Sequence, residues 1–332
     1  MHTVTRAALS FAVGLAAVGL AAGCGKAGSS GTKSPTEVKG AGCAPVAGQQ
    51  LTMLTDDKKL QAAENIIPAV NAKVADNAIT VLDKVSAAVG PKELLALNKA
   101  TNVDRKTPQV AAAEFASSVK LTDGITKGPG GKITIATANF NENQNLGELY
   151  KIVLTAAGYD ATVQQVGNRE LYEPSLEKGE IQVVPEYAGT LTEFLNKKVN
   201  GPNAQPLASG DTDKTVAALK DLGAKVGLKF GKPAEAADQN AFAVTKALAD
   251  KHKLTSLSDF AEKCSGKATV LGGPAECPQR PFCQPGLEKT YGIQIGRFAS
   301  LDAGGPQTLS ALRDGTITIG LVFSSDVAFA TS

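Results

Sequence analysis

Apolar and polar positions follow the helical period through much of the first third of the chain. Residues 51–54 and 66–70 are short apolar runs typical of strands, and stretches with an apolar side chain at every third or fourth position follow them. These stretches predict three helices, the last of which, at 109–119, opens on the Thr107-Pro108 pair typical of a helix start. Residues 49–121 are therefore expected to be mostly helical after two short strands.

From residue 132 onward the pattern changes to alternating strands and helices. Apolar runs such as 133–138 and 181–184 are separated by helical stretches, an order that favours a mostly parallel sheet with covering helices. The glycine- and proline-rich residues 122–132 separate the two patterns and predict a linker. After an extended crossing near residue 238 the alternation repeats on a smaller scale, so we expect an α/β fold of two lobes.

The beginning of the chain indicates export. Arg6 precedes an apolar stretch at 7–22 that is too short to span a membrane, and Gly23-Cys24 follows it. Small residues before a cysteine resemble a bacterial lipobox, which predicts lipidation of Cys24; an ordinary secretory signal cleaved nearby is the alternative. Residues 24–48 are poor in large apolar groups and predict a flexible tether. The protein is thus expected to be anchored to the outer face of a bacterial cell membrane.

Charge and cysteine content narrow the partners and the compartment. With 34 basic and 32 acidic side chains there is no basic stripe for nucleic acid. Removing Cys24 leaves an even number of cysteines, as expected in an oxidising compartment. Three pairings are open, but the two prolines of the short CPQRPFC loop favour Cys277 with Cys283, which leaves Cys43 for Cys264.

No arrangement of residues predicts catalysis, and we expect no enzyme activity. The single histidine of the mature chain, His252, lies among charged residues and not in a buried triad. The glycine-rich residues 128–132 have no serine or threonine after the lysine and precede a strand, whereas a phosphate-binding loop follows one. No metal or cofactor is expected.

The stretch 178–190, KGEIQVVPEYAGT, points instead to binding. An apolar strand there delivers Tyr187 and Thr190 at its carboxyl end, where α/β sheets hold small ligands. A small molecule is therefore the expected partner of this chain.

Five stretches in order resemble substrate-binding proteins of ABC importers for glycine betaine, choline and related quaternary amines. They are ITIATANFNENQNLGELYKIVLTAAGY (133–159), GNRELYEPSLEKGEIQVVPEYAGT (167–190), DQNAFAVT (238–245), CPQRPFCQPGLEKTYG (277–292) and GLVFSSD (320–326). The resemblance implies a bilobal periplasmic-binding-protein fold of type II, whose two lobes close about a hinge. It also implies delivery of a quaternary-ammonium osmolyte to a permease and ATPase by a protein that works as a monomer.

The order of the segments differs from the family. The stretch LTMLTDDKKLQAAENIIPAVN (51–71) and its helices resemble the family's C-terminal part but stand at the front here, which predicts a circular permutant. The expected domains are a signal peptide at 1–23, a tether at 24–48, a permuted segment of lobe 1 at 49–121, a linker at 122–132, the main part of lobe 1 at 133–237, lobe 2 with crossing strands at 238–326 and a C-terminal end at 327–332.

The resemblance also implies the ligand-binding residues. Tyr187 and Thr190 correspond to the family's tyrosine and threonine, and Phe242 and Phe323 to two cage tyrosines. Arg280, between two cysteines, corresponds to the arginine that binds a betaine carboxylate. 

Two further positions are implied less directly. Glu64 stands where the family has a fourth cage tyrosine, and either faces the cation or points to solvent. Asn139 and the asparagines after it add amide groups, which favour a more polar ligand than glycine betaine. A surface lipoprotein that senses a ligand or mediates adhesion, without transport, is the alternative function.

Overall fold

The computed structural model describes residues 38–329 of the chain. The predicted signal peptide, the lipidation site Cys24 and the first part of the tether lie outside the described residues, as do residues 330–332. Among the described helices none is long and apolar enough to cross a membrane.

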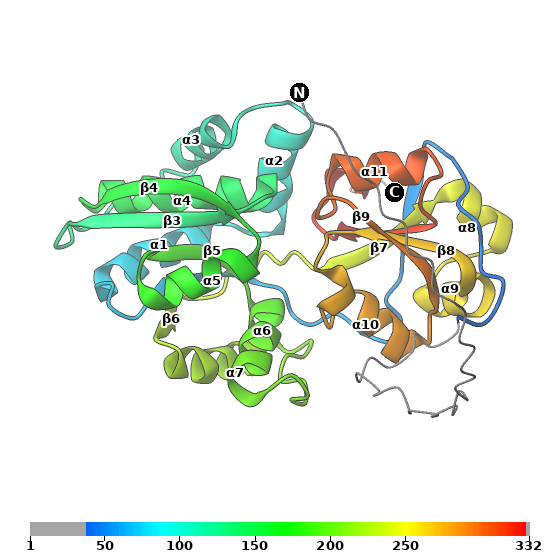
Figure 1. Ribbon diagram of the computed structural model, residues 1–332. Helices are drawn as coiled ribbons and strands as arrows, with labels where there is room; N and C mark the ends of the chain where they lie inside the picture. Colours follow the sequence, from blue (N-terminus) through cyan, green and yellow to red (C-terminus); the bar gives the residue numbers. More distant parts are fainter. Residues whose placement is uncertain (1–37, 330–332) are drawn as a thin grey trace, which may run out of the picture. The chain divides into compact units, whose positions relative to one another are not determined.

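The first lobe, residues 66–230, is built on a five-stranded sheet in the order β4-β3-β5-β2-β6 (Figure 1). β3 pairs in parallel with β4 and β5, whereas β2 pairs antiparallel with β5 and β6. Its elements are β2 (Ile66–Asn71), α1 (Asp76–Ala88), α2 (Pro91–Asn102), α3 (Pro108–Ser118), β3 (Lys132–Ala138), α4 (Asn141–Ala156), β4 (Asp160–Gly167), α5 (Arg169–Lys178), β5 (Val183–Tyr187), α6 (Ala188–Asn200), α7 (Thr212–Lys225) and β6 (Leu228–Phe230).

The second lobe, residues 38–54 and 240–323, has its own five-stranded sheet in the order β1-β7-β10-β8-β9. β8 pairs in parallel with β9 and β10, and β7 lies antiparallel between β1 and β10. Its elements are β1 (Leu51–Leu54), β7 (Asn240–Thr245), α8 (Lys246–His252), α9 (Leu257–Cys264), β8 (Gly266–Gly273), η1 (Cys277–Gln279), α10 (Gln284–Gly286), η2 (Leu287–Tyr291), β9 (Ile295–Ser300), α11 (Pro306–Arg313) and β10 (Ile319–Phe323), after which η3 (Val327–Phe329) follows.

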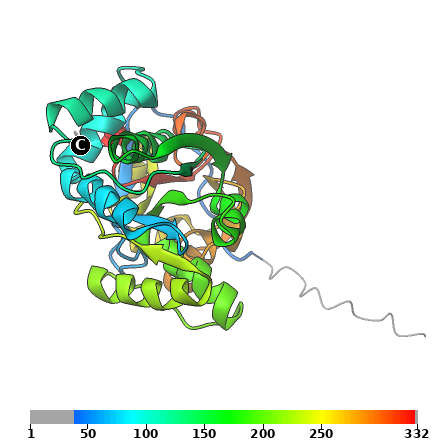
Figure 2. The same ribbon diagram turned by 90° about the vertical axis from the view of Figure 1, so that its left-hand side faces the viewer.

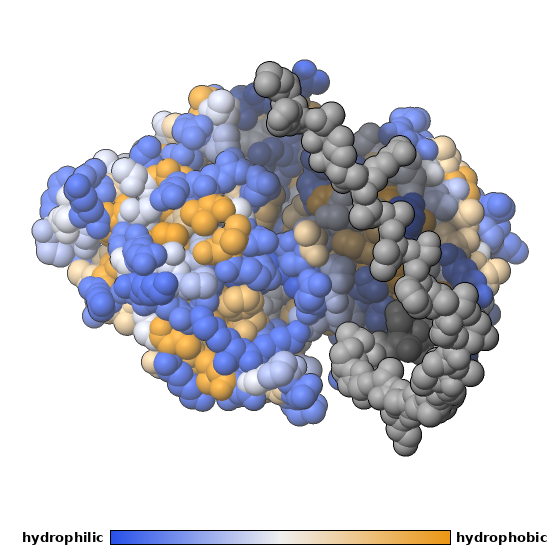
Figure 3. All heavy atoms as spheres, viewed as in Figure 1, coloured by the Kyte–Doolittle hydropathy of each residue, from blue (hydrophilic) through white to orange (hydrophobic). Residues whose placement is uncertain are grey.

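Helices cover both faces of the first sheet (Figures 1 and 2), which explains why its inner strands β2 and β5 are buried along their whole length. Ile66 and Val70 of β2 pack with α1 and α4 on one face, while Ile67 and Ala69 pack with the residues of α5, α6 and α7 on the other. On the face of the molecule seen in Figure 3, hydrophilic residues predominate. The two α/β lobes confirm the predicted fold class.

The chain passes between the two sheets at residues 55–65 and again at 231–239. The predicted grouping of 49–121 with lobe 1 therefore differs from the structure at its first strand, because β1 pairs with β7 in the second sheet. The predicted tether also ends early. Ala41 forms a β-bridge with Gly266, and Cys43 is buried, so residues from 41 onward are held on the second lobe.

Both favoured cysteine pairs are bonded, Cys43 with Cys264 and Cys277 with Cys283. The first closes a separation of 221 residues and fastens the start of the described chain to the second lobe. The second closes the short loop that carries Arg280.

Candidate functional site

A cavity of about 330 Å³ lies where the carboxyl ends of strands from both sheets meet. In the first lobe its lining follows β3, β4 and β5, and in the second lobe it follows β8, β9 and β10. This is the edge at which α/β sheets bind ligands. Of the predicted ligand-binding residues, those that line the cavity are Glu64, Asn139, Tyr187, Thr190, Arg280 and Phe323.

Tyr187 and Thr190 stand at the end of β5 and the start of α6. The Tyr187 ring is 8% exposed, and its hydroxyl donates a hydrogen bond of 2.8 Å to Glu142 Oε1. Thr190 Oγ1 accepts from Arg169 Nη2 at 2.9 Å and donates to Glu64 Oε2 at 3.3 Å. Each of the two side chains is thus fixed by a partner before any ligand arrives, which lowers the entropic cost of binding.

Three aromatic rings form one wall of the cavity. The Phe140 ring centroid lies 6.0 Å from that of Tyr187 and 5.4 Å from that of Phe323, both tilted pairs. Phe140 follows the end of β3 and Tyr187 ends β5, both in the first lobe, whereas Phe323 ends β10 in the second lobe. The rings therefore come from both lobes. The sequence reasoning missed Phe140 as a site residue, although it stands inside the NFNEN stretch directly beside Asn139.

Phe242, predicted as a cage residue, is buried in the core of the second lobe and does not line the cavity. It lies opposite Leu54 of β1 and Leu321 of β10 and packs with both. Asn240, two residues earlier on the same face of β7, lines the cavity instead. The cavity therefore meets β7 at its first residue, and Phe242 lies one step deeper in the sheet.

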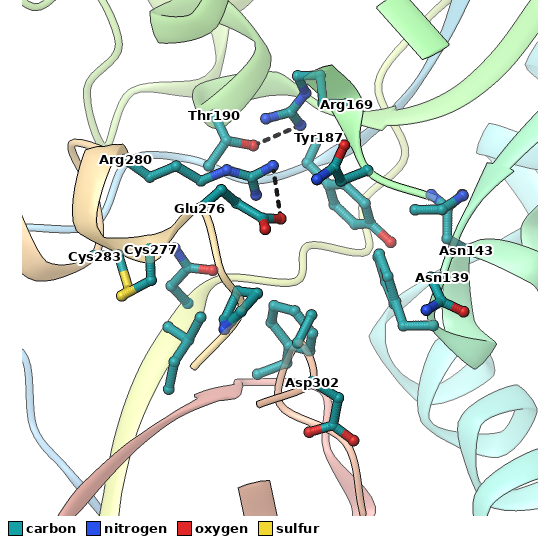
Figure 4. Close-up of a pocket in the computed structure, with 18 of the residues that line it drawn as sticks. Asn139, Asn143, Arg169, Tyr187, Thr190, Glu276, Cys277, Arg280, Cys283 and Asp302 are labelled. Carbon is teal, nitrogen blue, oxygen red and sulfur yellow. Dashed lines mark hydrogen bonds and ion pairs between the residues drawn. A yellow bond between two sulfur atoms is a disulfide. The ribbon is translucent and has the colours of Figure 1, made fainter. Parts of the chain in front are cut away.

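Arg280 reaches into the cavity from the loop closed by Cys277 and Cys283 (Figure 4). Its Nη2 lies 2.9 Å from Glu170 Oε2 in the first lobe and 3.2 Å from Glu276 Oε1 in the second. Burial tends to raise the pKa of Glu170, but the hydrogen bond and charge of Arg280 outweigh it and lower that pKa. The guanidinium is thus held by two carboxylates and is 29% exposed.

A buried ion pair that the sequence reasoning missed supports the same wall. Arg169, at the start of α5, donates from Nε and Nη2 to the two carboxylate oxygens of Glu186 at 2.8 and 2.5 Å. The Tyr172 hydroxyl donates to Glu186 Oε1 at 2.8 Å. Since Arg169 also holds Thr190, the pair sets the position of a predicted ligand-binding hydroxyl.

Glu64 does not point to solvent. Its side chain is 1% exposed, and burial raises the pKa of its carboxyl to about 8, against the opposing effects of Thr190 and Arg169. One oxygen, Oε1, has no hydrogen-bond partner among the described residues. A carboxyl with this pKa is mostly protonated at neutral pH, so Glu64 presents a neutral donor more often than a charge.

The asparagines after β3 have separate roles. Asn139 is exposed at the cavity rim, and its Oδ1 accepts from Gln165 Nε2 at 2.5 Å. Asn143 is fully buried: its Oδ1 accepts from the Ala138 amide at 2.7 Å, and its Nδ2 donates to the Pro185 carbonyl at 2.9 Å. Asn143 therefore ties β3 to β5 at the cavity edge.

One group of metal-ligand side chains occurs among the described residues, Cys43, His252 and Cys264, whose ligand atoms lie within 4.8 Å of one another. Its two sulfur atoms are joined in a disulfide. Because thiolates are the ligands that bind metals, the group does not offer a metal site in this form.

Comparison with known proteins identifies the family to which this chain is similar. Residues 45–118 and 131–332 match the family described as the substrate binding domain of ABC-type glycine betaine transport system. The glycine betaine-binding protein YehZ of Escherichia coli (strain K12) is 28% identical over 175 residues, which cover 52% of this chain and 55% of the relative. The chain thus aligns with about half the length of that curated relative.

A solved structure titled glycine betaine/carnitine/choline ABC transporter is 20% identical, with a TM-score of 0.37 over 60% of this chain and 71% of that one. The matching family comprises substrate-binding proteins, which work outside the cytoplasm and bind their solutes without transforming them. Because the two matched segments span most of the sequence, the chain belongs to the substrate-binding family of ABC-type glycine betaine transport systems.

Proposed function

We propose that this protein captures a small quaternary-ammonium solute, such as glycine betaine, choline or carnitine, and delivers it to an ABC permease. The observation that carries the proposal is the wall formed by Phe140, Tyr187 and Phe323. A cation over an aromatic face gains about 0.5–2 kcal/mol, and a quaternary ammonium has no N–H groups that need hydrogen-bond partners. A wall of rings therefore suits such a cation better than it suits a sugar or a primary amine.

Two other residues of the cavity lining offer groups for the ligand's other end. Arg280 presents a guanidinium suited to a carboxylate, and Thr190 adds a hydroxyl. Figure 4 shows Arg280 and Thr190 on the same side of the cavity, away from Asn139 and Asn143. We assign this side to the carboxylate of a betaine or to the hydroxyl of choline.

Capture would proceed by closure of the two lobes about the crossing segments. A ligand that touches rings of both lobes binds the closed state more tightly than the open one, which is what shifts the equilibrium toward closure. Two contacts already join the lobes near the cavity, Arg280 with Glu170 and Lys197 Nζ with the Gln279 carbonyl at 3.2 Å. The closed form would then dock on the permease.

Two further features belong to this proposal. Lipidation of Cys24 would anchor the protein outside the membrane, with the residues before 41 as tether. A circular permutation would place its join at the predicted linker, and the family match leaves 119–130 unmatched there, between two matched segments. The late turn η3 also contacts β1, so the late part of the chain lies beside its early part, as permutation requires.

Calorimetric titration of the chain from residue 38 with glycine betaine, proline betaine, carnitine, choline and ergothioneine tests the proposal. At least one is expected to bind in the micromolar range, and Phe140→Leu is expected to weaken it about 2- to 30-fold by loss of cation–π attraction. Phe115→Leu, a partly buried phenylalanine away from the cavity, is the control. Millimolar or weaker binding of all five, with tighter binding of an amino acid or sugar, would refute the proposal.

A further inference from the structure

Two buried carboxyl groups lie next to the aromatic wall. Glu142 is the second residue of α4 in the first lobe, and Asp238 lies on the crossing segment 231–239; each is 5% exposed. Asp238 lines the cavity, and Glu142 holds the hydroxyl of the cavity residue Tyr187. The two carboxyls are therefore joined to the cavity, one directly and one through a ring of its wall.

The hydrogen bonds around Ser325 require a proton on this pair. Ser325 Oγ lies 2.7 Å from Glu142 Oε2 and 2.7 Å from Asp238 Oδ1. A hydroxyl has one proton to donate, so with both carboxyls ionised one of these contacts would join two lone pairs. A proton on one carboxyl removes the conflict, because that carboxyl then donates to Ser325 or to its neighbour.

Neutral groups surround the pair. Glu142 accepts from Asn98 Nδ2 at 2.6 Å and from Tyr187, and Asp238 accepts from the Ser325 amide at 3.1 Å. Burial raises the pKa of Glu142, and burial together with the charge of Glu142 raises the pKa of Asp238 well above its usual range.

The charged side chains on the neighbouring elements do not neutralise the pair in this structure. Arg169 in the first lobe is bonded to Glu186. A second cavity, which Glu142 also lines, carries Asp302, Asp326 and Arg313 on its second-lobe side. Burial raises the pKa of Asp326, and the charge of Arg313 only partly offsets that rise. Glu64, on the other crossing segment, is the remaining buried acid of the cavity lining.

We propose that Glu142 and Asp238 form the counter-charge of the bound cation, and that binding of a permanent cation expels their shared proton to solvent. This inference rests on the proposed function. The O–H bond of one carboxyl breaks, the proton passes to water or buffer, and two carboxylates remain beside one positive charge. A permanent cation in a poorly hydrated cavity stabilises that second carboxylate, which is costly without it.

The release of a proton on binding determines how the affinity for a cation depends on pH. Since the free protein carries the proton and the complex does not, the affinity for a cation rises with pH below the apparent pKa of the free pair. Release of one proton gives at most about a tenfold rise in affinity per pH unit. A cation without a carboxylate, such as choline or tetramethylammonium, isolates this effect from the groups around Arg280.

Calorimetric titration of the chain from residue 38 with choline and with tetramethylammonium, at one pH near neutrality in phosphate and in Tris, tests the inference. These buffers take up protons with different enthalpies, so the difference in binding heat counts the protons released. We expect about one-half to one proton per choline, and tighter binding at pH 7.5 than at pH 5.5. Both measurements use this chain without substitutions.

Variants identify the source of the proton. Glu142→Gln and Asp238→Asn are each expected to abolish the buffer dependence, whereas Glu173→Gln is expected to retain it, because Glu173 is a buried acid whose pKa is likewise raised by burial but which does not line the cavity. Binding of choline with equal heat in both buffers overturns the inference and leaves the proposed function standing, as does loss of release in Glu64→Gln alone. Absence of binding by every quaternary amine overturns the proposed function, and this inference with it.

Discussion

Replacing Arg280 by alanine should separate ligands by their carboxylate. In the structure the guanidinium is held by Glu170 at 2.9 Å and Glu276 at 3.2 Å, so a ligand carboxylate must compete with these partners. A charge-assisted hydrogen-bonded contact is worth about 1.5–3 kcal/mol, and an exposed ion pair such as that with Glu170 about 0–1 kcal/mol. The difference of about 1–2 kcal/mol corresponds to glycine betaine binding that is roughly 5- to 30-fold weaker in Arg280→Ala.

Choline has no carboxylate, so the same variant should change its affinity less than about threefold. Titration calorimetry with both ligands gives the ratio of the two dissociation constants, which cancels any general damage to the cavity. Glu170→Gln should move the ratio the other way, since it releases Arg280 for the betaine carboxylate. Lys197→Ala is the control, because Lys197 also reaches the second lobe, at the Gln279 carbonyl, but does not line the cavity.

Equal weakening of both ligands in Arg280→Ala would refute the reasoning, because it would mean that Arg280 shapes the cavity without contacting the carboxylate. An unchanged ratio in Glu170→Gln, with a changed ratio in Arg280→Ala, would show that the carboxylate does not compete with Glu170.

Three other changes test the fold around the cavity. In Gly189→Ala the new Cβ would lie 2.8 Å from Ala62 Cβ. Overpacking of this kind should lower the free energy of unfolding, measured in urea, by about 1–3 kcal/mol. An unchanged free energy of unfolding would contradict this prediction. In the folded protein Glu64 keeps its proton up to a pKa of about 8, whereas the unfolded chain loses it near the ordinary pKa of a glutamate. The free energy of unfolding of the parent therefore falls as pH rises between those two values. The melting temperature of Glu64→Gln should rise relative to that of the parent from pH 5 to pH 8, and a constant difference would argue against this. Joint replacement of Cys277 and Cys283 by serine should cost about 2 kcal/mol of unfolding free energy relative to the oxidised parent by loop entropy. The difference should vanish when both proteins are reduced, because Cys43–Cys264 then opens in both, and a difference that persists would contradict the reasoning.

The binding strand could be predicted because its signal is local. The apolar run at 181–184, followed by a tyrosine and a Gly-Thr pair, placed Tyr187 and Thr190 at a strand end, and both line the cavity. The strand in the structure, β5, begins at Val183 and ends at Tyr187, so it starts and ends later along the chain than the predicted strand 181–184. Pro185 does not end it, because Pro185 lies opposite Pro68 of β2 within the sheet.

The depth at which a strand meets the cavity could not be predicted in the same way. Asn240 and Phe242 share one face of β7 and differ by two residues, about 7 Å along the strand. Periodicity assigns the face but not the position of the sheet edge, which depends on where β1 and β10 pair with β7. Arg169 was missed for a related reason, because a helix-start arginine has the pattern of a surface residue until the fold brings Glu186 against it.

The position of the linker explains how the proposed change of chain order would leave binding intact. Residues 122–131 lead into β3 at Lys132, whereas the cavity begins at the other end of that strand, after Ala138. Seven residues of extended chain separate the two points by about 20 Å. A new join at the start of β3 is thus remote from the rings and from Arg280. The crossing segments that carry Glu64 and Asp238 are in turn unaffected by where the chain begins, since both remain continuous with the strands they connect.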